Sequence, residues 1–307
     1  MDGREQPLVT VIALSYNHAP YIKEALESVY NQTYSNIELI IVDDASTDAS
    51  AAVIEEYIQG RSVQFFKNDI NAGNCRSFNN AFALAKGAYI IDFALDDLMY
   101  STRIEKQVAL FQQSDKKTGV VFTNVDLIDI NGKVLSPHYP AFHHKSHPSK
   151  IPEGNVFDAV LSQYYINPVG MMVRREVFEK LNGYDESLAY EDFDFWIRSS
   201  RIVEYRYIPE ILSAKRNVPA SLSSGFYTSH KEFMFDSTLQ VCRKAWWLCR
   251  SDSEKQALVK RCRYEARQAY RYNYVELVEE YLNILKLYDP VYWLYKPFVQ
   301  LSLWFRK

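Results

Sequence analysis

The chain has 307 residues, of which 48% are hydrophobic and 24% charged, so it can bury a large core and disorder is not expected. Its formal net charge of −3 argues against a nucleic-acid binder, because such proteins are usually basic. The four cysteines form no Cys-x-x-Cys pair, so reduced thiols in a cytoplasmic protein are expected.

The first hundred residues alternate between strand and helix patterns. Apolar strands are predicted at residues 8–14, 37–44, 63–68 and 88–95. Helices are predicted between them, at residues 20–32, 46–60 and 74–87. Because the strands are apolar throughout, this alternation predicts an α/β fold with a mainly parallel sheet covered by helices on both faces.

Beyond residue 100 the pattern becomes mixed. A predicted helix at residues 101–113 is followed by a strand pair at residues 118–135, with Asn131-Gly132 in the turn. Residues 137–152 form a loop rich in Pro, His and Ser. Residues 173–200 predict two helices joined by a Gly-containing turn, with an acidic cluster at the start of the second.

The last part of the chain is helical in pattern from about residue 226. We therefore expect an α/β domain at residues 1–225 and a helical C-terminal extension at residues 226–307. No segment reaches the roughly 18 apolar residues of a membrane span. The N-terminal residues indicate a first strand and not a signal peptide.

Paired carboxylates follow two of the predicted strands. Asp43 and Asp44 end the second strand, and Asp96 and Asp97 follow the fourth. Ligands of parallel α/β sheets bind beyond the carboxyl ends of the strands, and adjacent buried carboxylates are costly unless a positive charge compensates them. Capping of the following helix explains one acid but not two pairs. A divalent cation prefers such oxygen ligands and completes its shell with water and substrate phosphates.

No glycine-rich phosphate loop accompanies these acids. The sequence contains neither GxxxxGK[ST] nor GxGxxG, so a P-loop and a dinucleotide fingerprint are both excluded. Strand-end acids that hold a metal–diphosphate without such a loop favour a nucleotide-sugar site.

Three stretches resemble the motifs of family 2 glycosyltransferases, which have the GT-A fold. These stretches are "VIALSYNHAPYIKEALESVYNQTYSNIELIIVDDASTDAS" (11–50), "NAGNCRSFNNAFALAKGAYI" (71–90) and "GYDESLAYEDFDFWIR" (183–198). Each motif is loose, but their order and spacing together are specific, and the resemblance runs from about residue 9 to 224. It implies an inverting glycosyltransferase of the bacterial polysaccharide type.

The resemblance also implies which residues bind the donor. The nucleobase and ribose would be lined by Ser15, Tyr16, Asp43 and Asp44. Strand-end and cap roles are equally open for these four. Arg76 would reach the nucleotide, although an exposed helix arginine is an equally good reading. Asp96 and Asp97 would bind the metal–diphosphate, with Mg²⁺ or Mn²⁺ as the cation.

On the acceptor side, the resemblance implies that Asp192 is the general base for the acceptor hydroxyl. Glu191 and Asp194 would be supporting acids at the N-terminus of the same helix, where the helix dipole favours negative charge. Phe193, Phe195 and Trp196 are expected to face the core and so to fix the orientation of the helix.

Two positions depart from the family pattern. Ala94 replaces the first acid of the usual Asp-x-Asp motif, and Val218 stands where a histidine can help to hold the metal–diphosphate. Lys215 or Arg216 could supply positive charge to the diphosphate instead. Four histidines gather at His138, His143, His144 and His147. Without Cys pairs or an HExxH helix they favour a solvated loop over a zinc site.

The C-terminal residues 289–307 mix aromatic and basic side chains. This composition suits a helix at a membrane surface near a lipid-linked acceptor, which would place the protein at the inner face of the cell membrane. Packing on the α/β domain, or self-association through the C-terminal helices, is equally open.

The sequence therefore predicts transfer of a sugar from a nucleotide-diphosphate sugar to a hydroxyl of a saccharide or lipid-linked acceptor, in surface polysaccharide or glycolipid synthesis. The alternative is a catalytically silent sugar-nucleotide-binding or scaffold subunit of a polysaccharide assembly complex. Asp96, Asp97 and Asp192 favour the enzyme, whereas Ala94 and Val218 favour the alternative. A nucleotidyltransferase is disfavoured because a basic, glycine-rich triphosphate loop is absent.

Overall fold

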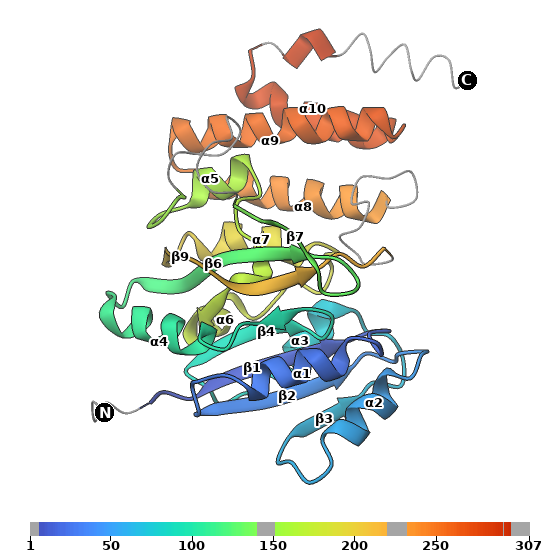
Figure 1. Ribbon diagram of the computed structural model, residues 1–307. Coiled ribbons are helices and arrows are strands. Elements are labelled where there is room, and N and C mark those ends of the chain that lie inside the picture. The colour runs from blue at the N-terminus through green and yellow to red at the C-terminus, as the bar shows by residue number, and fades with distance from the viewer. Residues whose placement is uncertain (1–5, 140–150, 220–231, 291, 296–307) are drawn as a thin grey trace. The chain divides into compact units, whose positions relative to one another are not determined.

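The computed structural model describes residues 6–139, 151–219, 232–290 and 292–295 (Figure 1). The chain divides into two compact units. The first comprises residues 1–155, 166–186 and 202–219, and the second comprises residues 156–165, 187–201 and 220–307. The predicted domain boundary between residues 225 and 226 lies outside the described residues and stays a prediction.

Within the described residues, the first unit is built on one nine-stranded sheet. Its parallel half has the order β3-β2-β1-β4, from β1 (Val9–Ser15), β2 (Ile37–Asp43), β3 (Gln64–Lys67) and β4 (Tyr89–Ala94). The connecting helices are α1 (Ile22–Tyr30), α2 (Ser50–Tyr57) and α3 (Asn74–Phe82). This confirms the α/β alternation predicted for the first hundred residues.

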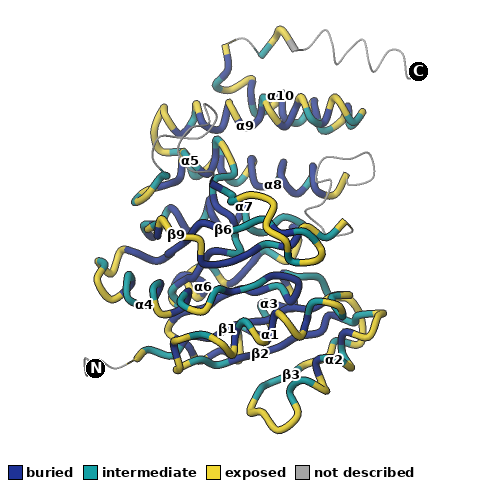
Figure 2. Tube along the Cα trace, viewed as in Figure 1, coloured by how far each residue is buried: buried dark blue, intermediate teal, exposed yellow. Residues whose placement is uncertain are grey.

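The apolar character of the central strands explains this arrangement. Every residue of β1 is buried, and Figure 2 shows the same along most of β2 and β4. The core contains Val11, Ala13, Ile41, Ile91 and Phe93. A strand covered on both faces cannot alternate apolar and polar residues, so it needs the continuous apolar runs that the sequence shows.

The second half of the sheet is mixed. It continues β8-β6-β9-β5, from β5 (Leu98–Met99), β6 (Thr118–Ile128), β8 (Met172–Arg174) and β9 (Glu204–Arg216). β7 (Val134–Pro137) pairs with β6 in the hairpin predicted around Asn131-Gly132. The helices α4 (Arg103–Gln113) and α6 (Arg175–Leu181) and the 3-10 turn η1 (Pro168–Gly170) belong to the same unit.

The long strand β9 was not predicted from the sequence. Its first part includes Pro209 and several exposed polar residues, which weaken a strand pattern. Pairing with β6 overrides these local signals, with register shifts near Thr123 and Asn124. β5 then pairs antiparallel with β9, with Leu98 opposite Ala214. This pairing brings the end of β9 to the turn that contains Asp96 and Asp97.

The second unit is helical in its described part. It contains α5 (Phe157–Ser162), α7 (Glu191–Ser199), α8 (Glu232–Leu248), α9 (Asp252–Arg271), α10 (Val275–Tyr288) and the 3-10 turn η2 (Tyr292–Tyr295). Ser251 and Glu254 form a capping box at the start of α9. The predicted helical character beyond residue 226 is confirmed where the chain is described. None of the described helices is long and apolar enough to cross a membrane.

Candidate functional site

The carboxyl ends of β2, β1 and β4 meet at one edge of the sheet. Ser15 is paired with Asp43 in the register of β1 and β2, and Leu14 is paired with Ala94 of β4. The backbone N–H of Leu95 then donates to the Leu14 carbonyl (2.9 Å). The two predicted acid pairs are therefore brought to the same edge, on either side of the end of β1.

The first acid pair organises the loops that follow β2. Asp43 accepts hydrogen bonds from the Ser46 N–H (2.9 Å) and the Ser46 hydroxyl (2.6 Å). Asp44 accepts from the Asn68 side chain (2.7 Å) and from two backbone N–H groups at the start of α3, those of Ala72 and Gly73 (both 2.8 Å). These contacts are the strand-end and cap roles left open by the sequence, and they give this edge of the sheet a defined shape.

The backbone between these acids and α2 is unusual. Ala45 has a positive φ of 60°, a conformation that a non-glycine residue adopts at a cost of about 1–3 kcal/mol. The loop after β1 contains a second such residue, Asn17, with φ of 59°. The Asn17 side-chain oxygen accepts the Thr47 N–H (2.8 Å), which ties the two loops together. Strain held in two facing loops is typical of a ligand-binding edge.

Ser15 and Tyr16 lie at the end of β1. Ser15 is buried, and its hydroxyl has no hydrogen-bond partner among the described residues. Tyr16 is 45% exposed, which is high for a large aromatic side chain beside a buried strand. The Tyr16 ring is therefore accessible to a ligand, and the Ser15 hydroxyl beside it is a buried polar group without a partner, which is uncommon in folded proteins.

The second acid pair lies in the turn between β4 and β5, and both aspartates are buried. Asp97 accepts the backbone N–H of Arg216 at the end of β9 (2.8 Å), and the Arg216 Nε donates to the Asp96 carbonyl (2.9 Å). Burial, and next the Asp96 charge, raise the pKa of Asp97 well above its usual value, and the positive charges of Lys215 and Arg216 oppose this shift. Within the described residues, the positive charges near Asp97 therefore do not fully offset its burial.

The Arg216 guanidinium is used within the protein. Its Nη2 donates to Glu24 (2.7 Å), and its Nη1 donates to the carbonyls of Asp129 and Ile130 (3.2 and 3.3 Å). It also lies over the Tyr21 ring (4.7 Å). Lys215 forms no ion pair within the described residues, so Lys215 is the better placed of the two predicted cations to meet a ligand.

Two basic residues that the sequence analysis did not select lie near the second acid pair. His18 Nε2 is 3.8 Å from Asp96 Oδ2, and His18 Nδ1 has no partner among the described residues. Arg103 is fully buried in α4, where burial lowers its pKa to about 9 and the Asp97 charge opposes this shift. The position of His18 just after β1 was the available signal, whereas nothing in the sequence marks Arg103 as buried.

Arg76 lies on α3 in an exposed ion pair. Its Nε is 2.9 Å from Glu186 Oε2, and Asn79 donates to the other oxygen of the same carboxylate (3.1 Å). The hydrogen bonds from Asn79 and Arg76 lower the pKa of Glu186. These contacts fit the alternative reading of Arg76 as an exposed helix arginine.

The predicted acceptor-side acids lie at the start of α7 in the second unit. Glu191 and Asp192 are partly exposed, while Phe193, Phe195 and Trp196 are buried, as expected. Asp194 is fully buried, with its two oxygens bound to Arg198 Nε (2.6 Å) and Lys244 Nζ (2.8 Å). Asp194 therefore has a structural role.

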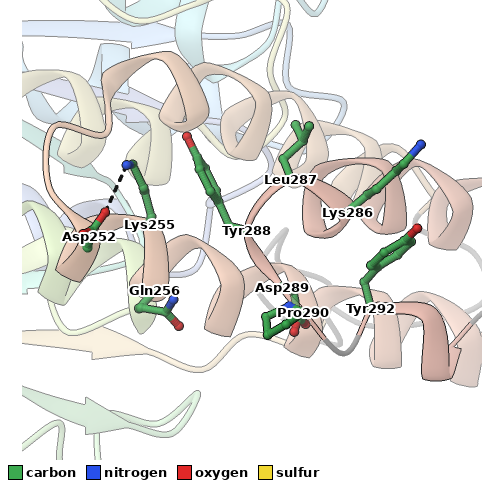
Figure 3. Close-up of a pocket in the computed structure, with 9 residues that line it drawn as sticks. All are labelled: Asp252, Lys255, Gln256, Lys286, Leu287, Tyr288, Asp289, Pro290 and Tyr292. Carbon is green, nitrogen blue, oxygen red and sulfur yellow. Dashed lines mark hydrogen bonds and ion pairs between the residues drawn. The ribbon is translucent and has the colours of Figure 1, made fainter.

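A pocket in the second unit lies between the start of α9 and the end of α10. Figure 3 shows its nine lining residues, with Lys255 bonded to Asp252 (3.0 Å). Lys255 also lies over the Tyr288 ring (5.3 Å). None of the predicted site residues lines this pocket, so it is not the candidate site.

The histidine loop is only partly described. His138 packs edge-on against Tyr139 (4.6 Å between ring centroids), whereas His143, His144 and His147 lie outside the described residues. Within the described ranges, no group of three or more His, Cys, Asp or Glu side chains is arranged to hold a metal ion.

Sequence comparison supplies the family. Residues 10–181, more than half of the chain, match the sequence model of glycosyl transferase family 2. An uncharacterized glycosyltransferase of Methanocaldococcus jannaschii is 32% identical over 203 residues, which are 63% of this chain and 65% of that protein. The chain thus spans less than two thirds of that relative's length. The family match ends before α7, so it does not include Asp192.

Comparison of structures supplies the fold. S. aureus TarS, solved in complex with UDP-GlcNAc, aligns with a TM-score of 0.67 at 15% identity, covering 92% of this chain and 80% of that one. The mannosyltransferase PcManGT of Pyrobaculum calidifontis, solved with GDP-Man and Mn²⁺, aligns with a TM-score of 0.60 at 17% identity, covering 94% and 76%. At such identities the likeness shows the fold alone, and the predicted GT-A fold is confirmed. With more than half of its length matched by the family's sequence model, the protein belongs to glycosyl transferase family 2.

Proposed function

We propose that this protein transfers a sugar from a nucleotide-diphosphate sugar to a hydroxyl group of an acceptor, with inversion at the anomeric carbon. The observation that carries the proposal is the meeting of both acid pairs at one edge of a parallel sheet, in a chain of a glycosyltransferase family. Ligands of such sheets bind at this edge.

The donor would lie across the ends of β1 and β2. Ser15, Tyr16, Asp43 and Asp44 would line the nucleobase and ribose pocket, with the Ser15 hydroxyl and the exposed Tyr16 ring as direct contacts. The two solved relatives hold UDP-GlcNAc and GDP-Man, which supports a sugar nucleotide as the class of donor. To bind the nucleotide, Arg76 would have to break its ion pair with Glu186. Of the proposed donor-binding residues, Arg76 therefore has the least structural support.

The second acid pair fits a divalent cation. Asp96 and Asp97 are adjacent and buried, and within the described residues the Asp97 carboxylate accepts one hydrogen bond, from the backbone N–H of Arg216. Mg²⁺ or Mn²⁺ is commonly held by one or two carboxylates and completes its shell with water and substrate phosphates, so a full set of protein ligands is not required. When bound there, the cation would neutralise charge on the diphosphate. Lys215 would add a second positive charge.

We expect donor and cation to stabilise the wild type together. Thermal unfolding with a panel of sugar nucleotides that includes UDP-GlcNAc and GDP-Man, with and without Mn²⁺, should show one donor that raises Tm more with the cation. A ligand at 100 times its Kd stabilises the folded state by about 2.7 kcal/mol. Asp96→Asn should lose this increase, whereas Asp115→Asn, on the exposed loop after α4, should keep it. A full cation-dependent increase in Asp96→Asn would contradict the assignment.

The pKa of Asp97 predicts how stability depends on pH. Because burial and Asp96 raise this pKa above 3.8, the folded state holds a proton that the unfolded state releases. Above pH 3.8 and up to the raised pKa, the free energy of unfolding of the cation-free wild type therefore falls as pH rises. Asp97→Asn removes this titration and keeps an oxygen for the Arg216 N–H, so its stability should fall less between about pH 4 and 7.

Urea denaturation at several pH values in the presence of a chelator measures this dependence. Asp115→Asn provides the matched control and should follow the wild type. Identical pH dependence of the wild type and Asp97→Asn would show that the Asp97 carboxyl titrates normally.

The transfer step needs a base on the acceptor side. The acceptor oxygen forms a bond to the anomeric carbon while the bond from that carbon to the diphosphate oxygen breaks, and the bonding electrons leave with the diphosphate. The hydroxyl proton goes to a carboxylate. Asp96 and Asp97 face the diphosphate in this scheme, and Asp194 is saturated by Arg198 and Lys244. Glu191 and Asp192 both remain, partly exposed at the start of α7, and the resemblance to the family 2 motif selects Asp192 as our candidate for the base.

Replacing this base should separate catalysis from binding. We expect Asp192→Asn to bind the donor with wild-type Kd and to lower kcat by about 10²–10⁴-fold, the usual range for loss of a general base. The rate can be followed as nucleotide release from the stabilising donor, with water or added saccharides as acceptor. Glu191→Gln is the control and should stay near the wild-type rate. An inactive Glu191→Gln with an active Asp192→Asn would move the base by one residue.

The alternative of a silent binding subunit makes a different prediction for the same assay. Such a subunit would bind the donor but release no nucleotide, in the wild type as in Asp192→Asn. Sequence similarity to other members of the family cannot separate the two, since a silent member keeps the fold. Measured turnover by the wild type therefore decides between an active transferase and a silent binding subunit.

The acceptor would be a saccharide or a lipid-linked saccharide of surface polysaccharide or glycolipid synthesis, with the protein at the inner face of the membrane. The described C-terminal residues offer apolar contacts for a membrane surface. Trp293 is 57% exposed and Leu294 48% exposed on η2, beyond Lys286 on α10. Most of the aromatic and basic segment at residues 289–307 lies outside the described residues.

Truncation tests the membrane contact. A cut after Asp289 keeps the ion pair between Arg263 and Asp289 at the end of α10, so the helices should remain folded. We expect the truncated protein to lose most of its sedimentation with anionic liposomes while its Tm stays within a few degrees of the wild type. Unchanged liposome binding would reject the membrane contact. A change from dimer to monomer in light scattering, without any lipid binding by the wild type, would indicate self-association instead.

A further inference from the structure

We propose that helix α8 positions the Asp192 carboxylate for proton transfer, with Ser237 and Lys244 as the two positioning residues. The inference rests on the proposed function, because it concerns the base of that reaction. It assigns to the C-terminal helices a part in the rate of transfer, and its observations lie entirely within the second unit.

The first anchor lies directly before the acid. Ser237 is buried on α8, and its hydroxyl oxygen accepts the backbone N–H groups of Ala189 (3.1 Å) and Tyr190 (3.0 Å). Tyr190 is the N-cap residue of α7 and makes no side-chain cap of its own. The two bonded N–H groups belong to the N-cap residue and the residue before it, so Ser237 holds the segment that leads into α7. Because Ser237 belongs to another helix, the start of α7 is fixed against α8.

The second anchor lies directly after the acid. Lys244 Nζ is 2.8 Å from Asp194 Oδ1, and Arg198 of α7 holds the other oxygen of the same buried carboxylate. A buried carboxylate tolerates only a well-aligned cationic partner, because it has lost its hydration. The ion pair therefore fixes the rotation of α7 about its axis as well as its distance from α8.

The two anchors share one face of α8. Ser237 and Lys244 are seven residues apart, which is close to two helical turns, so they point in nearly the same direction. Asp192 lies in the sequence between their partners, Tyr190 and Asp194. The carboxylate of Asp192 is thus carried by a helical turn that is held on both sides.

Apolar packing alone would not position the acid so closely. Phe193, Phe195 and Trp196 bury one face of α7, but the hydrophobic effect has no direction and permits small shifts along the helix. Hydrogen bonds and ion pairs have fixed lengths and angles. A misplacement of about 1 Å at a reacting group can cost about 10²-fold in rate, so loss of either polar anchor would lower kcat.

The test uses single substitutions on α8 in the full-length protein. Ser237→Ala removes the acceptor for the two N–H groups, and Lys244→Met keeps the apolar stem but removes the charge. Lys244→Arg keeps a cation and serves as the rescue variant. Arg243→Met is the matched control, since Arg243 is the neighbour of Lys244 on α8 but bonds Glu280 of α10 at an exposed position.

Four quantities are measured for each variant: Tm, donor Kd by calorimetry, and kcat and KM for nucleotide release, using UDP-GlcNAc with Mn²⁺ or whichever donor of the panel stabilises the wild type. Hydrogen exchange at Ala189 and Tyr190 reports directly on the first anchor. We expect Ser237→Ala and Lys244→Met to lower kcat by about 10- to 100-fold with donor Kd and KM unchanged. Lys244→Arg should recover most of the rate, and Arg243→Met should behave as the wild type.

The positioning role would be overturned if Ser237→Ala and Lys244→Met both kept the wild-type kcat while hydrogen exchange at Ala189 and Tyr190 became faster in Ser237→Ala. An equal loss of kcat and of donor affinity would overturn it too, because that is the result of general loosening. Asp192→Asn distinguishes failure of the positioning role of α8 from failure of the assignment of Asp192 as the base. If Asp192→Asn is inactive while the α8 variants keep wild-type kcat, only the positioning role falls. If Asp192→Asn turns over as fast as the wild type, the base assignment and its positioning fall together.

Discussion

The hydrogen bond from the Arg216 backbone to the Asp97 carboxylate links the two halves of the sheet at the candidate site. It joins the turn after β4 to the end of β9, 119 residues away in the sequence. The buried side chain of the same arginine also bonds the Asp96 carbonyl, Glu24 of α1, and the turn between β6 and β7. The pairing of β5 with β9 makes this possible. Without it, two adjacent buried carboxylates would lose the nearby positive charges of Lys215 and Arg216, and a poorly compensated buried charge is costly.

Much of the first unit was predictable because its signals are local. Strands covered on both faces leave continuous apolar runs, and the helices between them begin and end at recognisable residues. The strand β9 was missed because Pro209 and its polar neighbours weaken the pattern, and only the partner strand β6 makes it a strand. The hydrogen bonds of the Arg216 side chain within the protein were not predicted, for a related reason. Its partners are backbone carbonyls and a glutamate that are distant in sequence, and no spacing rule reports them.

The predicted site residues differ in whether contacts within the protein explain their presence. Asp44 and Arg76 have partners within the protein that explain them structurally, namely the N–H groups at the start of α3 and the Glu186 carboxylate. Ser15 and Tyr16 have no such explanation among their described contacts, since the buried Ser15 hydroxyl lacks a partner and the Tyr16 ring is exposed. Residue types and motif spacing alone could not make this distinction, because it depends on hydrogen bonds between loops that follow different strands.

Two buried aspartates differ in how far the protein compensates their charge. Asp194 receives a cationic donor on each oxygen, from Arg198 and Lys244, so its charge is satisfied inside the second unit. Asp97 receives one backbone N–H, and burial, followed by the charge of Asp96, raises its pKa. Burial alone is therefore not a sign of function, as both carboxylates are buried. The sign is a buried charge whose compensation is incomplete, because the folded protein then gains stability from a positively charged ligand. By this criterion the turn after β4 is where we propose that a positively charged ligand binds.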